Sequence, residues 1–340
     1  MFKYALLQNP GHNRVYFASS GKLAKNELAA LFTEILDIAE ESFGGVEYIT
    51  FSSKNALTKH ELLLLSRLSF VYAIFEICEG GLFSPAEKNH SYFFGDDLNT
   101  ILKYSGKTNE IFTRMKINLA VFASEYKNNF LDNLLMLDPV CGKGTAVFEA
   151  LTCGYNAYGL DINKKQIEEA TQFFKKYLEN GKYKHTKKEE KFSGAGFEGA
   201  AFRSTRHIFD IAKNKSDKKE NKNLICEFTD ADTRNAGKYY KKDTFHIIVG
   251  DLAYGIQHEN DTGKNKMRNP CDLIETSLPA WVGVLKPKGA LVLSWNTFLL
   301  ERKKLEDMFA ECNLVIADFG DFSHRVDQAI NRDLIIGVKN

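Results

Sequence analysis

Residues 135–145 read Leu135-Met136-Leu137-Asp138-Pro139-Val140-Cys141-Gly142-Lys143-Gly144-Thr145. An apolar run ends there in a carboxylate, and a turn with two glycines leads into the helix-forming run 146–151. This order predicts a buried strand, a tight loop and a helix start. Glycine lets backbone N–H groups approach a ligand closely, and a helix N-terminus carries partial positive charge. The stretch therefore predicts a ligand site at the carboxyl end of a strand.

A second carboxylate strengthens that prediction. The apolar run 157–160 ends in Asp161, and an acidic residue about 20 residues beyond such a loop suits the two hydroxyls of a ribose. The loop is not Gly-x-Gly-x-x-Gly, so it does not predict a dinucleotide site. It also lacks the spacing of a phosphate-binding Walker loop. We therefore expect a nucleoside-containing ligand of another class.

Length and composition predict an ordinary globular protein. A chain of 340 residues suits two domains, and the contents of 44% hydrophobic and 26% charged residues are typical of such proteins. No apolar run reaches the ~18 residues that span a membrane, and the N-terminus lacks a signal-peptide layout. The six cysteines form no C-x-x-C pair. We therefore expect a cytoplasmic protein with free thiols, no membrane partner and no metal site.

The charge is unevenly distributed along the chain. The formal net charge is only +1, but residues 181–223 hold 12 Lys and Arg against 6 Asp and Glu. Residues 1–105 hold 9 basic against 12 acidic residues. Any strong attraction to phosphates is therefore expected from residues 181–223.

The hydrophobic pattern changes character along the chain. Residues 1–102 predict a small α+β domain, with strands at 2–7, 14–18 and 46–51 and a helix over 22–40. From residue 134 onward strands and helices alternate, which predicts a doubly wound, Rossmann-like α/β sheet of seven strands. Its predicted strands are 134–138, 156–160, 224–228, 245–250, 289–294, 313–318 and 333–338. Its predicted helices are 145–153, 163–180, 271–284 and 299–311. A hairpin between the last two strands would make the final strand antiparallel.

Residues 181–223 interrupt this alternation without clear periodicity. We expect a partly mobile insertion. It is either a solvated surface loop or a basic flap that meets nucleic-acid phosphates, with Phe192, Phe197 and Phe202 free to stack on bases.

A third acidic position follows the strand 245–250. Asp251 and Tyr254 lie in Asp251-Leu252-Ala253-Tyr254-Gly255, and ligands of open α/β sheets bind beyond the carboxyl ends of the strands. An exocyclic amine of a nucleobase is a poor nucleophile because its lone pair is delocalised. A carboxylate that accepts hydrogen bonds from the amine favours attack, and an aromatic face holds the base in line. We expect Asp251 and Tyr254 to play these two roles.

Together the two motifs resemble those of the THUMP-associated guanosine-N2 RNA methyltransferases. Residues 138–145 are similar to that family's Asp-Pro-x-Cys-Gly-x-Gly-Thr, and residues 251–255 to its Asp-Pro-Pro-Tyr-Gly. The resemblance covers about residues 103–175 and 224–340. It implies an S-adenosyl-L-methionine (SAM)-dependent methyltransferase domain at 103–340, with the basic insertion 181–223, and an N-terminal substrate-recognition domain at 1–102. Leu252 and Ala253 depart from the motif by replacing both prolines.

The resemblance also implies an activity and a set of site residues. The activity is methyl transfer to an exocyclic base amine of RNA, guanosine N2 in tRNA. Asp232, rather than Asp230, would accept the adenine amine of SAM, and Thr113 would lie in a helix over its methionine end. Two alternatives stay open, a DNA adenine-amine methyltransferase and a non-catalytic RNA-binding protein on a methyltransferase fold. The implied cofactor-binding residues are Asp138, Cys141, Gly142, Gly144, Thr145, Asp161, Asp232 and Thr113.

Overall fold

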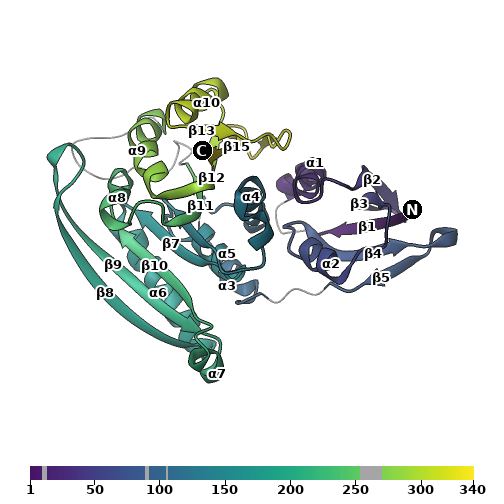
Figure 1. Ribbon diagram of the computed structural model, residues 1–340, viewed down its shortest axis with the longest axis horizontal. Helices are drawn as coiled ribbons and strands as arrows, with labels where there is room; N and C mark the ends of the chain where they lie inside the picture. Colours follow the sequence, from purple (N-terminus) through teal and green to yellow (C-terminus); the bar gives the residue numbers. More distant parts are fainter. Residues whose placement is uncertain (10–13, 89–91, 105, 253–269) are drawn as a thin grey trace.

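The structure, a computed structural model, describes residues 1–9, 14–88, 92–104, 106–252 and 270–340 and contains two β-sheets (Figure 1). The first sheet has five antiparallel strands in the order β2-β3-β1-β4-β5. Its elements, in chain order, are β1 (Phe2–Gln8), α1 (Arg14–Leu31), β2 (Leu36–Phe43), β3 (Val46–Ser53), α2 (Lys59–Ser66), β4 (Val71–Ile77) and β5 (Phe83–Ala86).

Two predictions for this part of the chain were wrong. Residues 14–18, expected as a strand, belong to α1, and the helix expected over 22–40 ends at Leu31. Residues 36–43 instead form β2, which pairs with β3 around Gly44 and Gly45. Their φ values of +60° and +82° are those of a tight hairpin turn. The glycine pair was the signal that outweighed the helical spacing.

In the part of the chain that the structure describes, the second sheet has ten strands and contains the predicted alternation. Its order is β13-β15-β12-β11-β6-β7-β10-β9-β8, with β14 paired to β15. The neighbours from β12 to β10 are parallel, whereas β15 is antiparallel to both β12 and β13, as expected. The strands are β6 (Leu135–Asp138), β7 (Asn156–Asp161), β8 (Lys184–Ala195), β9 (Ala201–Ala212), β10 (Leu224–Asp230), β11 (Phe245–Asp251), β12 (Leu285–Asn296), β13 (Leu314–Ile316), β14 (His324–Arg325) and β15 (Asn331–Lys339). The helices are α3 (Asp97–Thr100), α4 (Glu110–Ala123), α5 (Thr145–Thr152), α6 (Lys164–Asn180), α7 (Lys215–Lys219), α8 (Ala236–Tyr239), α9 (Pro270–Val284) and α10 (Arg302–Glu311).

The expected count of seven strands is therefore corrected to ten. The additional strands are β8, β9 and β14, and the expected aperiodic insertion is largely an ordered hairpin of β8 and β9 that extends the sheet beyond β10. Its pattern escaped notice because β8 is an exposed edge strand rich in charged residues. Such residues protect an edge from further pairing, but they hide the alternation that marks a strand.

The parallel strands place their last residues at one edge of the sheet. Asp138, Asp161, Asp230 and Asp251 end β6, β7, β10 and β11. These four strands are neighbours in the sheet, so four carboxylates converge on what we call the carboxyl edge.

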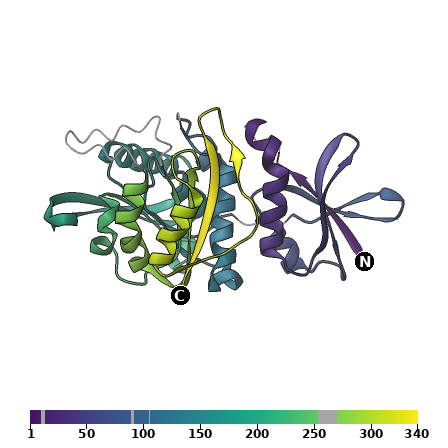
Figure 2. The same cartoon turned by 90° about the horizontal axis from the view of Figure 1, so that it is seen from above.

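Helices α1 and α4 lie side by side between the two sheets (Figures 1 and 2). One hydrophobic core runs across this contact, from Leu28 of α1 to Leu119 of α4 and on to the second sheet. The boundary between domains at residue 102 stays a prediction. Among the helices that the structure describes, none has both the length and the apolar character needed to cross a bilayer.

Candidate active site at the carboxyl edge

The glycine loop (residues 139–144) connects β6 to α5 in a shape that requires glycine. Gly142 and Gly144 have φ values of +52° and +89°, a backbone region that other residues rarely adopt. A Cβ atom on Gly144 would also lie 2.8 Å from the Phe228 ring. The two glycines therefore let the chain turn sharply at the carboxyl edge.

Asp161 holds this loop from the neighbouring strand. Its Oδ2 accepts a hydrogen bond of 2.8 Å from the backbone N–H of Gly142, and its Oδ1 accepts one of 2.8 Å from Asn163. Cys141 is buried, and its side chain fills the space over Gly159 of β7. Thr145 shares a hydrogen bond of 2.6 Å with the Tyr104 hydroxyl. The predicted loop residues and Asp161 thus form one cluster.

Asp138 supports the loop from beneath. Its side chain is buried, and its Oδ1 accepts a hydrogen bond of 3.1 Å from the Val140 N–H. Burial raises the pKa of Asp138 to about 7, although this bond and the nearby Lys116 ammonium act in the opposite direction. A buried carboxyl in this position shapes the loop rather than meeting solvent.

Asp251 lies within a network of hydrogen-bond donors. Ser294 donates to its Oδ1 at 2.5 Å, and Thr108 donates to its Oδ2. The Lys116 ammonium lies 3.8 Å from the same Oδ2. Burial would raise the pKa of Asp251, but Lys116, Arg332 and the two hydroxyls outweigh it and hold the pKa at about 2. Asp251 is therefore ionised at neutral pH and is a hydrogen-bond acceptor.

Three other predicted site residues have different surroundings. Asp232 makes bidentate hydrogen bonds of 2.6–3.0 Å with Arg234, whose guanidinium stacks over Phe197 at the tip of the β8–β9 hairpin. Thr113 is buried and donates to the Asn109 carbonyl of its own helix, at 3.0 Å. Tyr254 lies outside the described residues.

Sequence reasoning missed the residues that surround Asp251. Thr108 and Ser294 lie 143 and 43 residues from Asp251 along the chain, and no local pattern predicts their contacts with it. Lys116 did leave a signal. It is a single lysine on the apolar face of α4, four residues after Phe112 and four before Ala120.

The aromatic rings of the hairpin contact other side chains of the protein. Phe192 and Phe202 pack against Tyr239, with ring centroids 5.5 and 5.7 Å apart, and Phe197 contacts Arg234. These rings fix the hairpin to the body of the sheet. All three rings are half-buried, and their stacking on bases stays a prediction.

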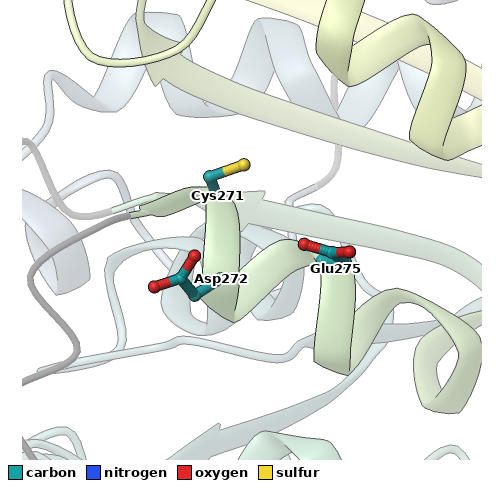
Figure 3. Close-up of side chains that lie close together, drawn as sticks. All are labelled: Cys271, Asp272 and Glu275. Carbon is teal, nitrogen blue, oxygen red and sulfur yellow. The ribbon is translucent and has the colours of Figure 1, made fainter.

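A group of possible metal ligands lies at the start of α9 (Figure 3). Cys271, Asp272 and Glu275 bring one ligand atom each within 4.8 Å of one another. Cys271 is buried and the two carboxylates are exposed. Lys304 hydrogen-bonds Cys271, and this bond raises the pKa of the lysine. The Lys304 ammonium beside the thiol would repel a metal cation, so we assign no metal site to these three residues.

Comparisons with known proteins give only distant likenesses. No protein-family model matches the chain, and no curated protein matches it. A solved TehB-like SAM-dependent methyltransferase from Corynebacterium glutamicum is 14% identical, with a TM-score of 0.35, over 61% of this chain and 81% of that chain. Magnesium protoporphyrin IX methyltransferase from Synechocystis, solved with bound SAM, is 12% identical (TM-score 0.39; 70% and 87% covered). A putative rRNA methylase from Clostridium thermocellum is 14% identical (TM-score 0.37; 64% and 94% covered). At such scores these likenesses assign no activity to the chain.

Proposed function

We propose that the protein is a SAM-dependent methyltransferase that acts on an exocyclic base amine of RNA. The observation that carries the proposal is the convergence of the glycine loop, Asp161 and Asp251 on adjacent strands of one sheet edge. A nucleoside-bearing cofactor and a base amine can be bound next to each other at such an edge. The solved methyltransferases above are compatible with this proposal but add no weight to it.

The residues present fit the cofactor. The glycine loop and the N-terminus of α5 follow β6 at the carboxyl edge, and the half-buried Asp161 carboxylate can accept hydrogen bonds from ribose hydroxyls. Asp232 would bind the adenine amine, which requires Arg234 to share or release that carboxylate. Cys141, Thr145 and Thr113 would support the pocket from behind. SAM supplies a methyl group on a positively charged sulfur.

Asp251 would act on the acceptor. Because its carboxylate is ionised, it accepts a hydrogen bond from the amine and stabilises the positive charge that develops on the nitrogen. Tyr254 would hold the base by stacking, as the motif resemblance implies. Guanosine N2 in tRNA is the substrate that this resemblance favours.

The test begins with cofactor binding and ends with product identity. Calorimetry with SAM comes first, followed by labelled SAM with separate RNA and DNA pools from cells lacking the protein, and by nucleoside analysis. We expect N2-methylguanosine in RNA. Methyladenine in DNA would support the alternative enzyme, and RNA binding without transfer would support a non-catalytic protein.

The variant Asp251→Ala separates the two binding functions. It should lower the rate of methyl transfer by ~10²–10³-fold, the usual cost of one preorganised polar group. SAM affinity should stay close to that of the wild type, because Asp251 faces the acceptor. Full activity in Asp251→Ala would exclude the base-amine mechanism.

A further inference from the structure

The lysine beside Asp251, Lys116, is the charged side chain of the site that is most shielded from solvent. Only 1% of the Lys116 side chain is exposed, against 21% for Asp251. A bound base can therefore reach Asp251 but not Lys116. An ammonium buried this deeply is costly unless it is paired, so its partners define what it does.

These partners form a chain with a fixed direction. The Lys116 ammonium donates to Ser294 Oγ at 2.9 Å, and Ser294 donates its own proton to Asp251 Oδ1 at 2.5 Å. A hydroxyl that accepts from a cation becomes a stronger donor. Thr108 donates to the other carboxylate oxygen from the segment before α4. The carboxylate of Asp251 is thereby held on both sides by groups from α4, β12 and residue 108.

We propose that Lys116 is a positioning residue that keeps Asp251 ionised and, through Ser294, oriented toward the substrate amine. The role toward a substrate amine rests on the proposed function. The pairing itself rests on the buried contacts alone. No step of the reaction passes through Lys116, because the exposed part of the network is Asp251.

Other charged groups also face Asp251, and they determine how far its pKa depends on Lys116. Arg332 of β15 also lowers the pKa of Asp251. Among the described residues, the pKa values of Asp138 of β6, His324 of β14 and Tyr104 also respond to this charge network. Burial and Arg332 lower the pKa of Lys116 itself, and Asp251 opposes them. Of the groups that lower the pKa of Asp251, Lys116 has the largest effect. Removing its charge should therefore raise that pKa even with Arg332 in place.

The first experiment measures this charge effect without any activity. Urea unfolding is followed from pH 3 to pH 9 for the wild type, Lys116→Met, Asp251→Asn and the double variant. We expect the double variant to be more stable than Asp251→Asn alone, because the latter leaves a buried ammonium unpaired. Relative to the double variant, the wild type should gain stability as pH rises through the acid range, because the folded pKa of Asp251 is held below its unfolded value. Lys116→Met should show less of this gain, because its Asp251 pKa is higher than that of the wild type.

The second experiment follows the rate of methyl transfer to total RNA across the same pH range. Lys116→Met should show a new loss of rate toward acid pH, where Asp251 becomes protonated, and SAM affinity should be retained. Ser294→Ala keeps the ammonium and removes the hydroxyl that orients the carboxylate, so it should lower the rate across the whole pH range, with a smaller additional loss toward acid pH than Lys116→Met. Lys127→Met is the matched control. Lys127 donates to the Ala30 carbonyl at 2.9 Å, so its loss should leave the pH profile unchanged.

The outcomes separate this proposal from the proposed function. Absence of transfer by the wild type would exclude the methyltransferase, while the unfolding series would still test the pair. Additive effects of Lys116→Met and Asp251→Asn on stability at every pH would overturn the pairing. An unchanged pH profile in an active Lys116→Met, or an even loss of its rate across pH, would overturn the positioning role.

Discussion

At the scale of single residues, Asp161 is where the loop and the proposed cofactor meet. Its carboxylate already accepts hydrogen bonds from Gly142 and Asn163, and a ribose would add two more donors. Asp161→Ala removes a charged acceptor and loosens the loop, so SAM affinity should fall by about 1.5–3 kcal/mol. Calorimetry measures this directly, and an unchanged affinity would place the ribose elsewhere.

Asp138 gives a second residue-scale prediction, on stability. Its pKa is about 7 in the folded protein and about 4 in an unfolded chain. The folded state therefore holds a proton that the unfolded state has released, and stability should fall as pH rises from about 4 to 7. Asp138→Asn keeps an acceptor for Val140 and cannot ionise. It should flatten this part of the pH profile of urea unfolding. The same slope in the variant would assign the proton to another group.

At the scale of elements, the β8–β9 hairpin divides the basic residues into two sets. Since β9 runs antiparallel to β10, the hairpin tip lies by the carboxyl edge and α7 lies at the opposite edge, far from Asp251 (Figure 1). The expectation that all of residues 181–223 can reach a bound substrate is therefore too broad. The two sets are Lys187, Lys188, Lys191 and Arg203 on the hairpin strands, and Lys215, Lys218, Lys219 and Lys222 around α7; all eight are exposed. Within the first set, Lys191 and Arg203 lie toward the tip, whereas Lys187 and Lys188 lie level with the first half of β10.

Neutralising each set to Gln tests which one meets RNA. Each lost phosphate contact lowers the slope of log affinity against log salt by about 0.7–0.9. We expect the hairpin variant to bind total RNA more weakly, with a slope reduced by about three units if all four residues contact phosphates. The α7 variant, which removes the same number of charges, should keep the slope. Equal effects in the two variants would indicate a diffuse field, and no effect in either would place the RNA site elsewhere.

The elements also mark how far the sequence could predict the molecule. Each strand that ends in a carboxylate was predictable, because apolar run, Asp and turn lie within about ten residues of one another. The hairpin was missed because an exposed edge strand has no buried face to create alternation. The network around Asp251 was out of reach, because Thr108 and Ser294 meet it only after the sheet has formed. Features set by neighbouring residues in the sequence were predictable, and contacts between residues far apart in the sequence were not.

At the scale of the whole molecule, Glu27 links the two sheets. It is fully buried in α1, and it accepts hydrogen bonds from the Ser69 N–H and hydroxyl and, at 2.7 Å, from the Asn118 amide of α4. Arg67 makes a second link through the Cys153 carbonyl at 2.5 Å. Burial raises the pKa of Glu27, and the hydrogen bonds from Ser69 and Asn118 act in the opposite direction.

Glu27→Ala should therefore weaken the whole fold and not only the first sheet. It leaves buried donors of Ser69 and Asn118 without their acceptor, at about 1–3 kcal/mol for each such group. Glu27→Gln retains an acceptor and should cost less, and the exposed Glu34→Ala should stay within about 0.5 kcal/mol of the wild type. If the two sheets unfold together, urea denaturation of Glu27→Ala stays a single transition with a lower midpoint. If residues 1–102 form a separate domain, the loss of stability appears as an early transition that leaves SAM binding intact at intermediate urea. The shared core between α1 and α4 favours the first result, because apolar residues of both helices belong to one hydrophobic cluster.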